Sequence, residues 1–130
     1  RMLDKYAKSL EVEPEKITFN AMDEALLKRA MAIVEKNMDN IEFSTDEFAR
    51  EMNMSRSNLH LKLKAITGES TIDFIRKIRF NEAAKLLKDG RYTVAEVSTM
   101  VGFNTPSYFA TSFKKYFGCL PTEYIKKSKG

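Results

Sequence analysis

The sequence predicts an all-α fold of seven helices, which form two helix-turn-helix subdomains joined by a long linker helix. Its composition is globular and poor in helix breakers, with 43% hydrophobic residues and only 5 Gly and 3 Pro among 130 residues. Two pairs of short amphipathic segments each begin with a helix-capping sequence. The second pair repeats the first at an offset of about 50 residues, which indicates a tandem duplication.

The first helix of each pair is marked by a capping sequence. Ser44 and Thr93 are suited to N-cap positions, where a side-chain oxygen accepts a hydrogen bond from an early helical amide. Glu47 and Glu96 follow three residues later, where each can bond back to the amide of its cap. The sequence therefore predicts a short helix after each cap.

The second helix of each pair has its own start and stop. Ser55 caps the first and Thr105 the second, with Pro106 at the favoured first helical position. Gly68 and Gly118 suit the two C-terminal ends. The 3.6-residue period predicts buried stripes made by Leu59, Leu63 and Ile66 in the first helix and by Phe109, Phe113 and Tyr116 in the second.

Three more helices complete the seven. One is expected from Asp23 to about Met38, the linker helix from about Thr71 to Lys88, and a short last helix after Pro121. The predicted division is 1–22 for a linker remnant from a preceding domain, 23–70 and 91–130 for the two helix-turn-helix subdomains, and 71–90 for the linker helix. Within the remnant, residues 2–10 suit a short amphipathic turn and residues 17–19 an extended segment.

Residue counts exclude several classes of protein. No apolar run approaches the roughly 20 residues of a membrane span, and no signal-peptide pattern is present, so we expect a soluble cytoplasmic chain without a membrane partner. The single Cys119 and single His60 supply too few ligands for a zinc site, and we expect no metal and no cofactor. Without a paired nucleophile and base or a Gly-rich phosphate loop, the chain is not expected to be an enzyme.

Charge is distributed unevenly along the chain. Residues 23–54 sum to −4, whereas residues 55–130 carry 14 basic and 6 acidic residues and sum to +8. Such a division is typical of a protein that docks on a polyanion, although a solvated surface explains the charge alone equally well.

The exposed faces of the two second helices distinguish these interpretations. Residues opposite the buried stripes are Ser57, His60, Leu61 and Lys64 in the first helix and Ser107, Ala110, Thr111 and Lys114 in the second. Small, hydrogen-bonding and cationic side chains on a helix-turn-helix suit the major groove of DNA. A linker helix of about 18 residues is about 27 Å long, enough to hold two recognition helices near the ~34 Å separation of successive major-groove faces.

Family motifs point the same way. The strings Val101-Gly102-Phe103, Ser107-Tyr108-Phe109, Phe113-Lys114 and Phe117-Gly118 precede Pro121, and Ser55 opens the first recognition helix. With these motifs, the span from about Asp23 to Lys127 resembles the DNA-binding domain of the AraC/XylS transcription activators. The segments 33–37, 48–52 and 54–57 are similar to the output domain of hybrid two-component regulators from Bacteroidota. This resemblance implies a receiver domain before residue 1 and carbohydrate-utilisation genes as targets.

The resemblance also implies site residues and partners. Base-reading positions fall on Ser57, His60, Leu61, Pro106, Ser107, Tyr108 and Thr111. Candidate phosphate contacts are Ser55, Arg56, Lys64, Arg76, Lys77, Arg79, Thr105, Lys114 and Lys115. For the three cations of the linker helix, simple solvation is an equal alternative. The family often has Arg or Gln where this chain has Leu61 and Thr111.

The predicted function is sequence-specific binding of double-stranded DNA by a transcription regulator. The resemblance implies an activator, with RNA polymerase as a second candidate partner. The alternative is a nonspecific nucleic-acid-binding module, whose affinity would be dominated by salt. The apolar stripes are used within two small cores, and no sustained heptad seam remains. The isolated domain is therefore expected to be a monomer, with dimerisation through domains preceding residue 1.

Overall fold

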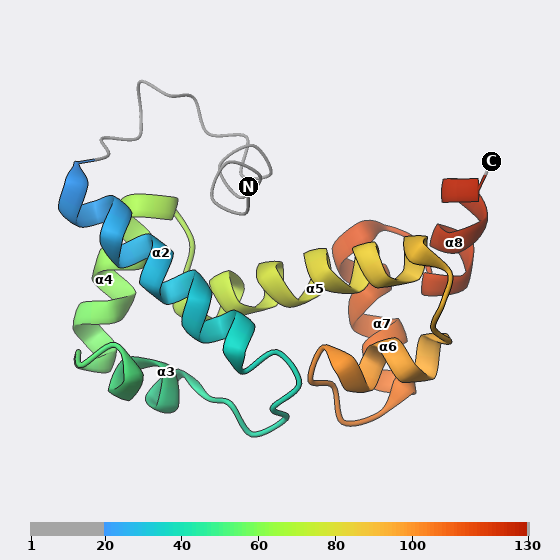
Figure 1. Ribbon diagram of the computed structural model, residues 1–130, viewed down its shortest axis with the longest axis horizontal. Helices are drawn as coiled ribbons and strands as arrows, with labels where there is room; N and C mark the ends of the chain where they lie inside the picture. The colour runs from blue at the N-terminus through green and yellow to red at the C-terminus, as the bar shows by residue number, and fades with distance from the viewer. Residues whose placement is uncertain (1–19, 130) are drawn as a thin grey trace. The chain divides into compact units, whose positions relative to one another are not determined.

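The computed structural model describes residues 20–129, which contain seven α-helices and no strand (Figure 1), as predicted. The amphipathic turn and extended segment expected within residues 1–19 lie outside the described residues. The helices are α2 (Ala21–Lys36), α3 (Thr45–Glu51), α4 (Arg56–Thr67), α5 (Thr71–Asp89), α6 (Val94–Met100), α7 (Pro106–Phe117) and α8 (Pro121–Lys129).

The described chain packs as two compact units. Unit 1 contains α2, α3, α4 and the start of α5 up to Ile75. Unit 2 contains the loop Asn37–Phe43, the rest of α5 from Arg76, and α6, α7 and α8. The predicted division instead places this loop in the first subdomain and makes the linker helix a separate segment, whereas the structure groups the loop with unit 2 and shares α5 between the two units. The reason is that α5 buries Phe74 in unit 1 and Phe80 in the core of unit 2.

Local capping sets where the short helices begin. The Ser44 hydroxyl accepts a hydrogen bond from the Glu47 amide at 3.2 Å, and the Thr93 hydroxyl accepts one from the Glu96 amide at 3.0 Å. The Glu96 carboxylate also accepts from the Thr93 amide at 2.8 Å, which completes the predicted capping box. The Glu47 carboxylate binds the Arg50 guanidinium. At the start of α2, the Asn20 side chain accepts from the amide three residues later, a cap that was not predicted from the sequence.

Helices α4 and α7 are built in the same way. The Ser55 and Thr105 hydroxyls each accept a hydrogen bond from the amide three residues later, at 3.1 Å. Gly68 and Gly118 end the two helices in the left-handed region, with φ of 80° and 85°, and each amide donates to the carbonyl four residues earlier. Both predicted helix ends are confirmed.

The core of unit 1 lies among α2, α3, α4 and the start of α5. Leu27 of α2, Phe48 of α3, and Leu59 and Leu63 of α4 are fully buried. The ring of Phe48 stacks on Phe74 of α5, with centroids 6.0 Å apart. Burial of these side chains is the main favourable term that holds the unit together.

The core of unit 2 is aromatic. Phe113 of α7 is fully buried, and its ring centroid lies 5.6 Å from that of Phe109, 4.5 Å from Phe117 and 5.5 Å from Tyr124. Tyr116 was predicted in the buried stripe, but it is 41% exposed. Its ring stacks on Phe80 of α5 with centroids 4.9 Å apart, so it covers the core from outside and leaves its other side to solvent.

Candidate nucleic-acid interface

Helix α4 presents a polar face opposite its buried leucines. Ser57, His60, Leu61 and Lys64 are all exposed, and Leu61 is 64% exposed. The N-terminus of α4 also carries Arg56, whose guanidinium pairs with the Asp46 carboxylate of α3 at 3.2 Å. The predicted exposure of this face is confirmed, and its contacts with DNA stay a prediction.

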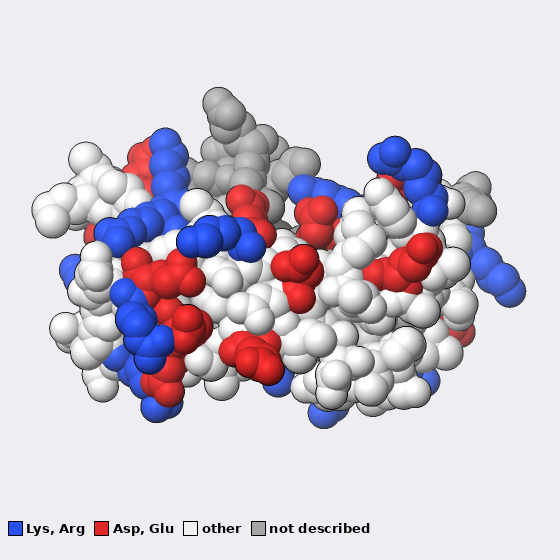
Figure 2. Space-filling view, turned by 60° about the horizontal axis from the view of Figure 1, so that its bottom comes forward, with Lys and Arg blue, Asp and Glu red and all other residues white. Residues whose placement is uncertain are grey.

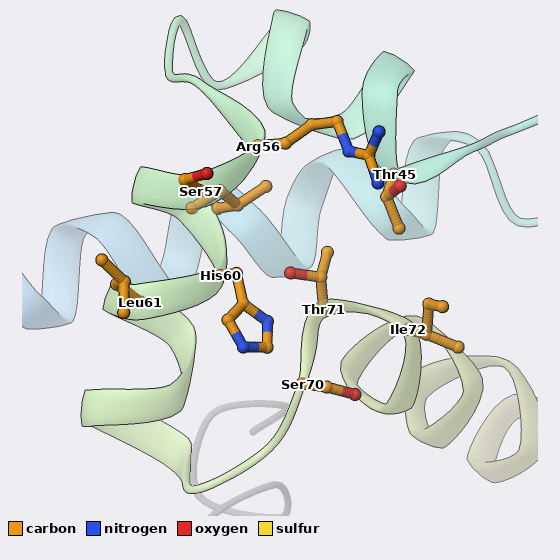
Figure 3. A pocket seen from close by; sticks show the side chains of 9 residues that line it. Thr45, Arg56, Ser57, His60, Leu61, Ser70, Thr71 and Ile72 are labelled. Atoms are coloured by element: carbon orange, nitrogen blue, oxygen red, sulfur yellow. The ribbon is translucent and has the colours of Figure 1, made fainter.

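A hollow lies beside α4 in unit 1. Figure 3 shows the His60 ring directed toward the segment that carries Ser70 and Thr71, whereas Leu61 points away from that segment. The hollow has a volume of about 710 Å³ and is lined by Thr45, Arg56, Ser57, Leu59, His60, Leu61, Ser70, Thr71 and Ile72. Sequence reasoning missed the contributions of Thr45 and residues 70–72, because only packing brings the starts of α3 and α5 to the side of α4.

Helix α7 presents the equivalent face in unit 2. Ser107, Tyr108 and Thr111 are exposed, as is Pro106 at the first helical position, while Ala110 is half-buried. The Thr111 hydroxyl donates a hydrogen bond to the Ser107 carbonyl at 3.0 Å. The centroid of the Tyr108 ring lies 5.5 Å from that of Phe103, and Tyr108 is 55% exposed.

Charge on these two helices is of one sign. Neither α4 nor α7 contains an acidic residue, and their exposed cations are Arg56, Lys62, Lys64, Lys114 and Lys115. Helices α2 and α3 each carry three acidic residues, and several of these form ion pairs such as Lys28–Glu24 at 3.5 Å. Figure 2 shows a face on which acidic and basic side chains are interspersed. The exposed sides of α4 and α7 therefore suit a polyanion better than α2 or α3 does.

Arg79 corrects the predicted set of phosphate contacts. It is only 9% exposed, and its guanidinium donates to three backbone carbonyls: those of Asn40 at 2.9 Å, Asn37 at 3.2 Å and Gly102 at 3.4 Å. Burial lowers the pKa of Arg79 from its usual value, and the nearby Asp39 carboxylate opposes that shift. Both the phosphate contact and simple solvation are wrong for Arg79, because its donors bind the interior of unit 2.

The other predicted phosphate contacts are either buried or exposed in the structure. Lys77 is also 9% exposed, so most of its side chain is covered, and its phosphate contact stays a prediction. Ile75, Ile78 and Phe80 around it are buried because this helix serves both cores, whereas the neighbouring Arg76 is exposed. The exposed candidates are Ser55, Arg56, Lys64, Arg76, Thr105, Lys114 and Lys115.

Two other kinds of site are absent from the part of the chain that the structure describes. Within residues 20–129, no helix combines the length and apolarity needed to cross a membrane. Three or more His, Cys, Asp or Glu side chains do not gather there into a group able to hold a metal ion. Within residues 20–129, the candidate binding surfaces are the exposed faces of α4 and α7.

Comparison with known proteins gives a matching family model and a similar protein of known name. A family model described as "Helix-turn-helix domain" matches residues 48–127. The chain is 38% identical over 124 residues to histidine kinase P4 of Formosa agariphila, a match that covers 95% of this chain and 9% of the kinase. The chain thus spans about a tenth of the length of that relative.

Solved structures agree on the fold. The C-terminal domain of AraT, a response regulator from Geobacillus stearothermophilus, is 30% identical with a TM-score of 0.73, and the match covers 78% of this chain and 84% of that one. The DNA-binding domain of AdpA, solved in complex with a target DNA, has a TM-score of 0.70 at 24% identity, over 78% and 90% of the two chains. The second likeness shows the fold alone.

Two helix-turn-helix units, each with an exposed second helix that has no acidic residue, are the arrangement of a DNA-binding domain. The chain belongs to the helix-turn-helix family, with the AraC-type arrangement of two such motifs.

Proposed function

We propose that α4 and α7 each enter a major groove of double-stranded DNA, and that the chain is the output domain of a longer two-component regulator that activates transcription. The observation that carries this proposal is the equivalence of the two helices, which share a hydroxyl side chain as N-cap, a glycine as C-cap and an exposed face without acidic residues. The relatives named as a histidine kinase and a response regulator support the regulatory context. Contact with RNA polymerase and a cytoplasmic location belong to the same proposal.

Selection of bound sequences from a random DNA pool tests this function. A sequence-specific domain enriches a motif with two recognisable half-sites, because base-edge contacts discriminate among sequences. Enrichment of no motif, with affinity that depends on salt alone, would support the alternative of a nonspecific nucleic-acid-binding module.

The lysines and the base-reading residues should behave differently. Lys64→Ala and Lys114→Ala are expected to weaken binding to all sequences alike, and each should lower the salt slope by about one unit because one phosphate loses its cationic partner. Substitutions at His60, Leu61, Ser107 and Thr111 should instead cost about 1–3 kcal/mol at one base pair and relax specificity there. Titrations against single-base operator variants at several salt concentrations measure both effects. Unchanged base preference in all four of the latter variants would contradict the assignment.

The spacing of the half-sites supplies another test. Helix α5 is one helix of 19 residues, about 28 Å long. If it stays rigid on DNA, the domain should require half-sites about 10 base pairs apart. Inserting about five base pairs turns one half-site to the far side of the duplex, and affinity should fall toward that of a single unit. Equal affinity for both spacings would mean that the two units bind independently.

The isolated domain is expected to bind DNA as a monomer with moderate affinity. Fusing an unrelated dimeric protein before residue 1 should strengthen binding to an operator with two full sites about a hundredfold, because the second binding event becomes intramolecular. The same fusion should hardly change binding to one full site, which serves as the control. A stable dimer of the isolated chain at micromolar concentration, measured by sedimentation, would contradict this prediction.

A further inference from the structure

Two equivalent positions of the proposed recognition helices carry aliphatic groups, although a side chain that contacts a base is expected at each of them. Leu61 of α4 and Thr111 of α7 lie 50 residues apart, at the same place in their helices, and both are exposed. Leu61 has no hydrogen-bonding group in its side chain. It is 64% exposed between polar neighbours on the same face, so a large apolar surface faces solvent in the free protein.

Thr111 resembles Leu61 more than its residue type suggests. Its hydroxyl proton is already donated to the Ser107 carbonyl at 3.0 Å, within the same helix. That donor is therefore not available to a base edge unless the bond breaks, which leaves the γ-methyl group and the acceptor lone pairs of the hydroxyl oxygen to contact a base. Both positions thus present methyl groups to the surface that we assign to DNA.

In the major groove, only thymine among the four bases displays a methyl group, at C5. Apolar side chains contact that methyl, whereas guanine, adenine and cytosine are read there through hydrogen-bonding groups. Charge complementarity brings DNA to this surface, since α4 and α7 carry only basic charged side chains. We propose that Leu61 and Thr111 are specificity-determining residues that each read the C5-methyl group of a thymine, one in each half-site.

This inference rests on the proposed function, and replacing single thymines by deoxyuracil in the selected operator tests it. That substitution removes only the methyl group and keeps the base pair. For the unaltered chain, we expect one position in each half-site at which uracil weakens binding about fourfold, the effect of removing one buried methyl-sized group. Titrations with each substituted duplex locate these positions.

Variants of the protein then assign each methyl to a side chain. Leu61→Ala should abolish the uracil penalty in the first half-site only. Thr111→Ser, which removes the methyl and keeps the hydroxyl, should abolish it in the second half-site only. Thr111→Val keeps a methyl and removes the hydroxyl, so the penalty should persist. Ile72→Ala is the matched control for Leu61, because Ile72 is an exposed aliphatic residue of the same hollow that is not on α4.

Each outcome bears on the inference. Uracil that is neutral at every thymine would overturn it while leaving sequence-specific binding intact. A penalty that persists in Leu61→Ala and Thr111→Ser would assign the methyl contacts to other residues and overturn it equally. A domain that selects no sequence at all would overturn the proposed function, and the inference with it. Circular dichroism and thermal unfolding confirm that each variant is folded before titration.

Discussion

Replacing Phe113 with alanine is expected to destabilise unit 2 by about 3–5 kcal/mol, the usual cost of truncating a buried aromatic residue. Phe113 is fully buried, and it contacts the rings of Phe109 and Phe117 of its own helix and of Tyr124 of α8. The substitution leaves a cavity that these rings cannot fill without moving. Since whole domains are stable by only about 5–15 kcal/mol, unit 2 would be close to unfolded.

Tyr116→Ala is the matched control, since it removes an aromatic ring from the same helix at a position 41% exposed. Its cost should be less than half that of Phe113→Ala, because less apolar surface leaves a buried environment. Urea unfolding followed by near-ultraviolet circular dichroism measures both, as the aromatic core lies in unit 2. Equal losses for the two variants would show that burial of Phe113 is not what stabilises the unit.

The Gly102→Ala substitution should be strongly destabilising for a different reason. Gly102 lies in the turn between α6 and α7 with φ of +81°, a left-handed conformation that costs an L-residue about 1–2 kcal/mol. An added Cβ would also lie 2.6 Å from the Met38 carbonyl oxygen and 2.9 Å from the Arg79 guanidinium carbon. Neither neighbour moves freely, because the guanidinium binds the carbonyls of the same loop.

Gly90→Ala separates the effect of the positive φ from the effect of the atoms that crowd the added Cβ. Gly90 has nearly the same φ, +80°, but its Cβ would meet no atom within 4 Å. Gly90→Ala should therefore lose only the backbone term of about 1–2 kcal/mol, while Gly102→Ala should lose clearly more. Thermal unfolding of the two variants under the same conditions gives the comparison. Equal losses would mean that the turn relaxes away from the carbonyl and from Arg79.

Local signals in the sequence were sufficient to predict the starts and ends of the helix-turn-helix motifs. Ser55 and Thr105 were predicted as caps, and both accept the expected amide hydrogen bond from three residues along the chain. Gly68 and Gly118 end their helices with positive φ, as predicted. These features depend on partners within about four residues, so the sequence alone contains the information. The same holds for the exposed faces of α4 and α7, which follow from helical periodicity.

Other features were decided only by packing between distant segments. Arg79 was predicted to contact phosphate or solvent, yet its hydrogen-bond acceptors are carbonyls 23, 39 and 42 residues away along the chain. Tyr116 continues the apolar stripe of its helix, but Phe80 of α5 takes the interior position and leaves Tyr116 partly in solvent.

The loop Asn37–Phe43 shows the same limit, because its membership of unit 2 depends on contacts with residues far along the chain. The sequence by itself determined which segments are helical, where the helices of the two helix-turn-helix motifs begin and end, and which side of α4 and α7 meets solvent, but it placed both ends of α2 two residues too late. Only the tertiary structure decided which cations are buried, which loop joins which core, and which residues line the hollow beside α4. The physical reason is the separation along the chain over which each interaction acts. Helix caps and helical periodicity depend on residues within a turn or two, whereas the burial of a residue depends on which distant segment packs against it.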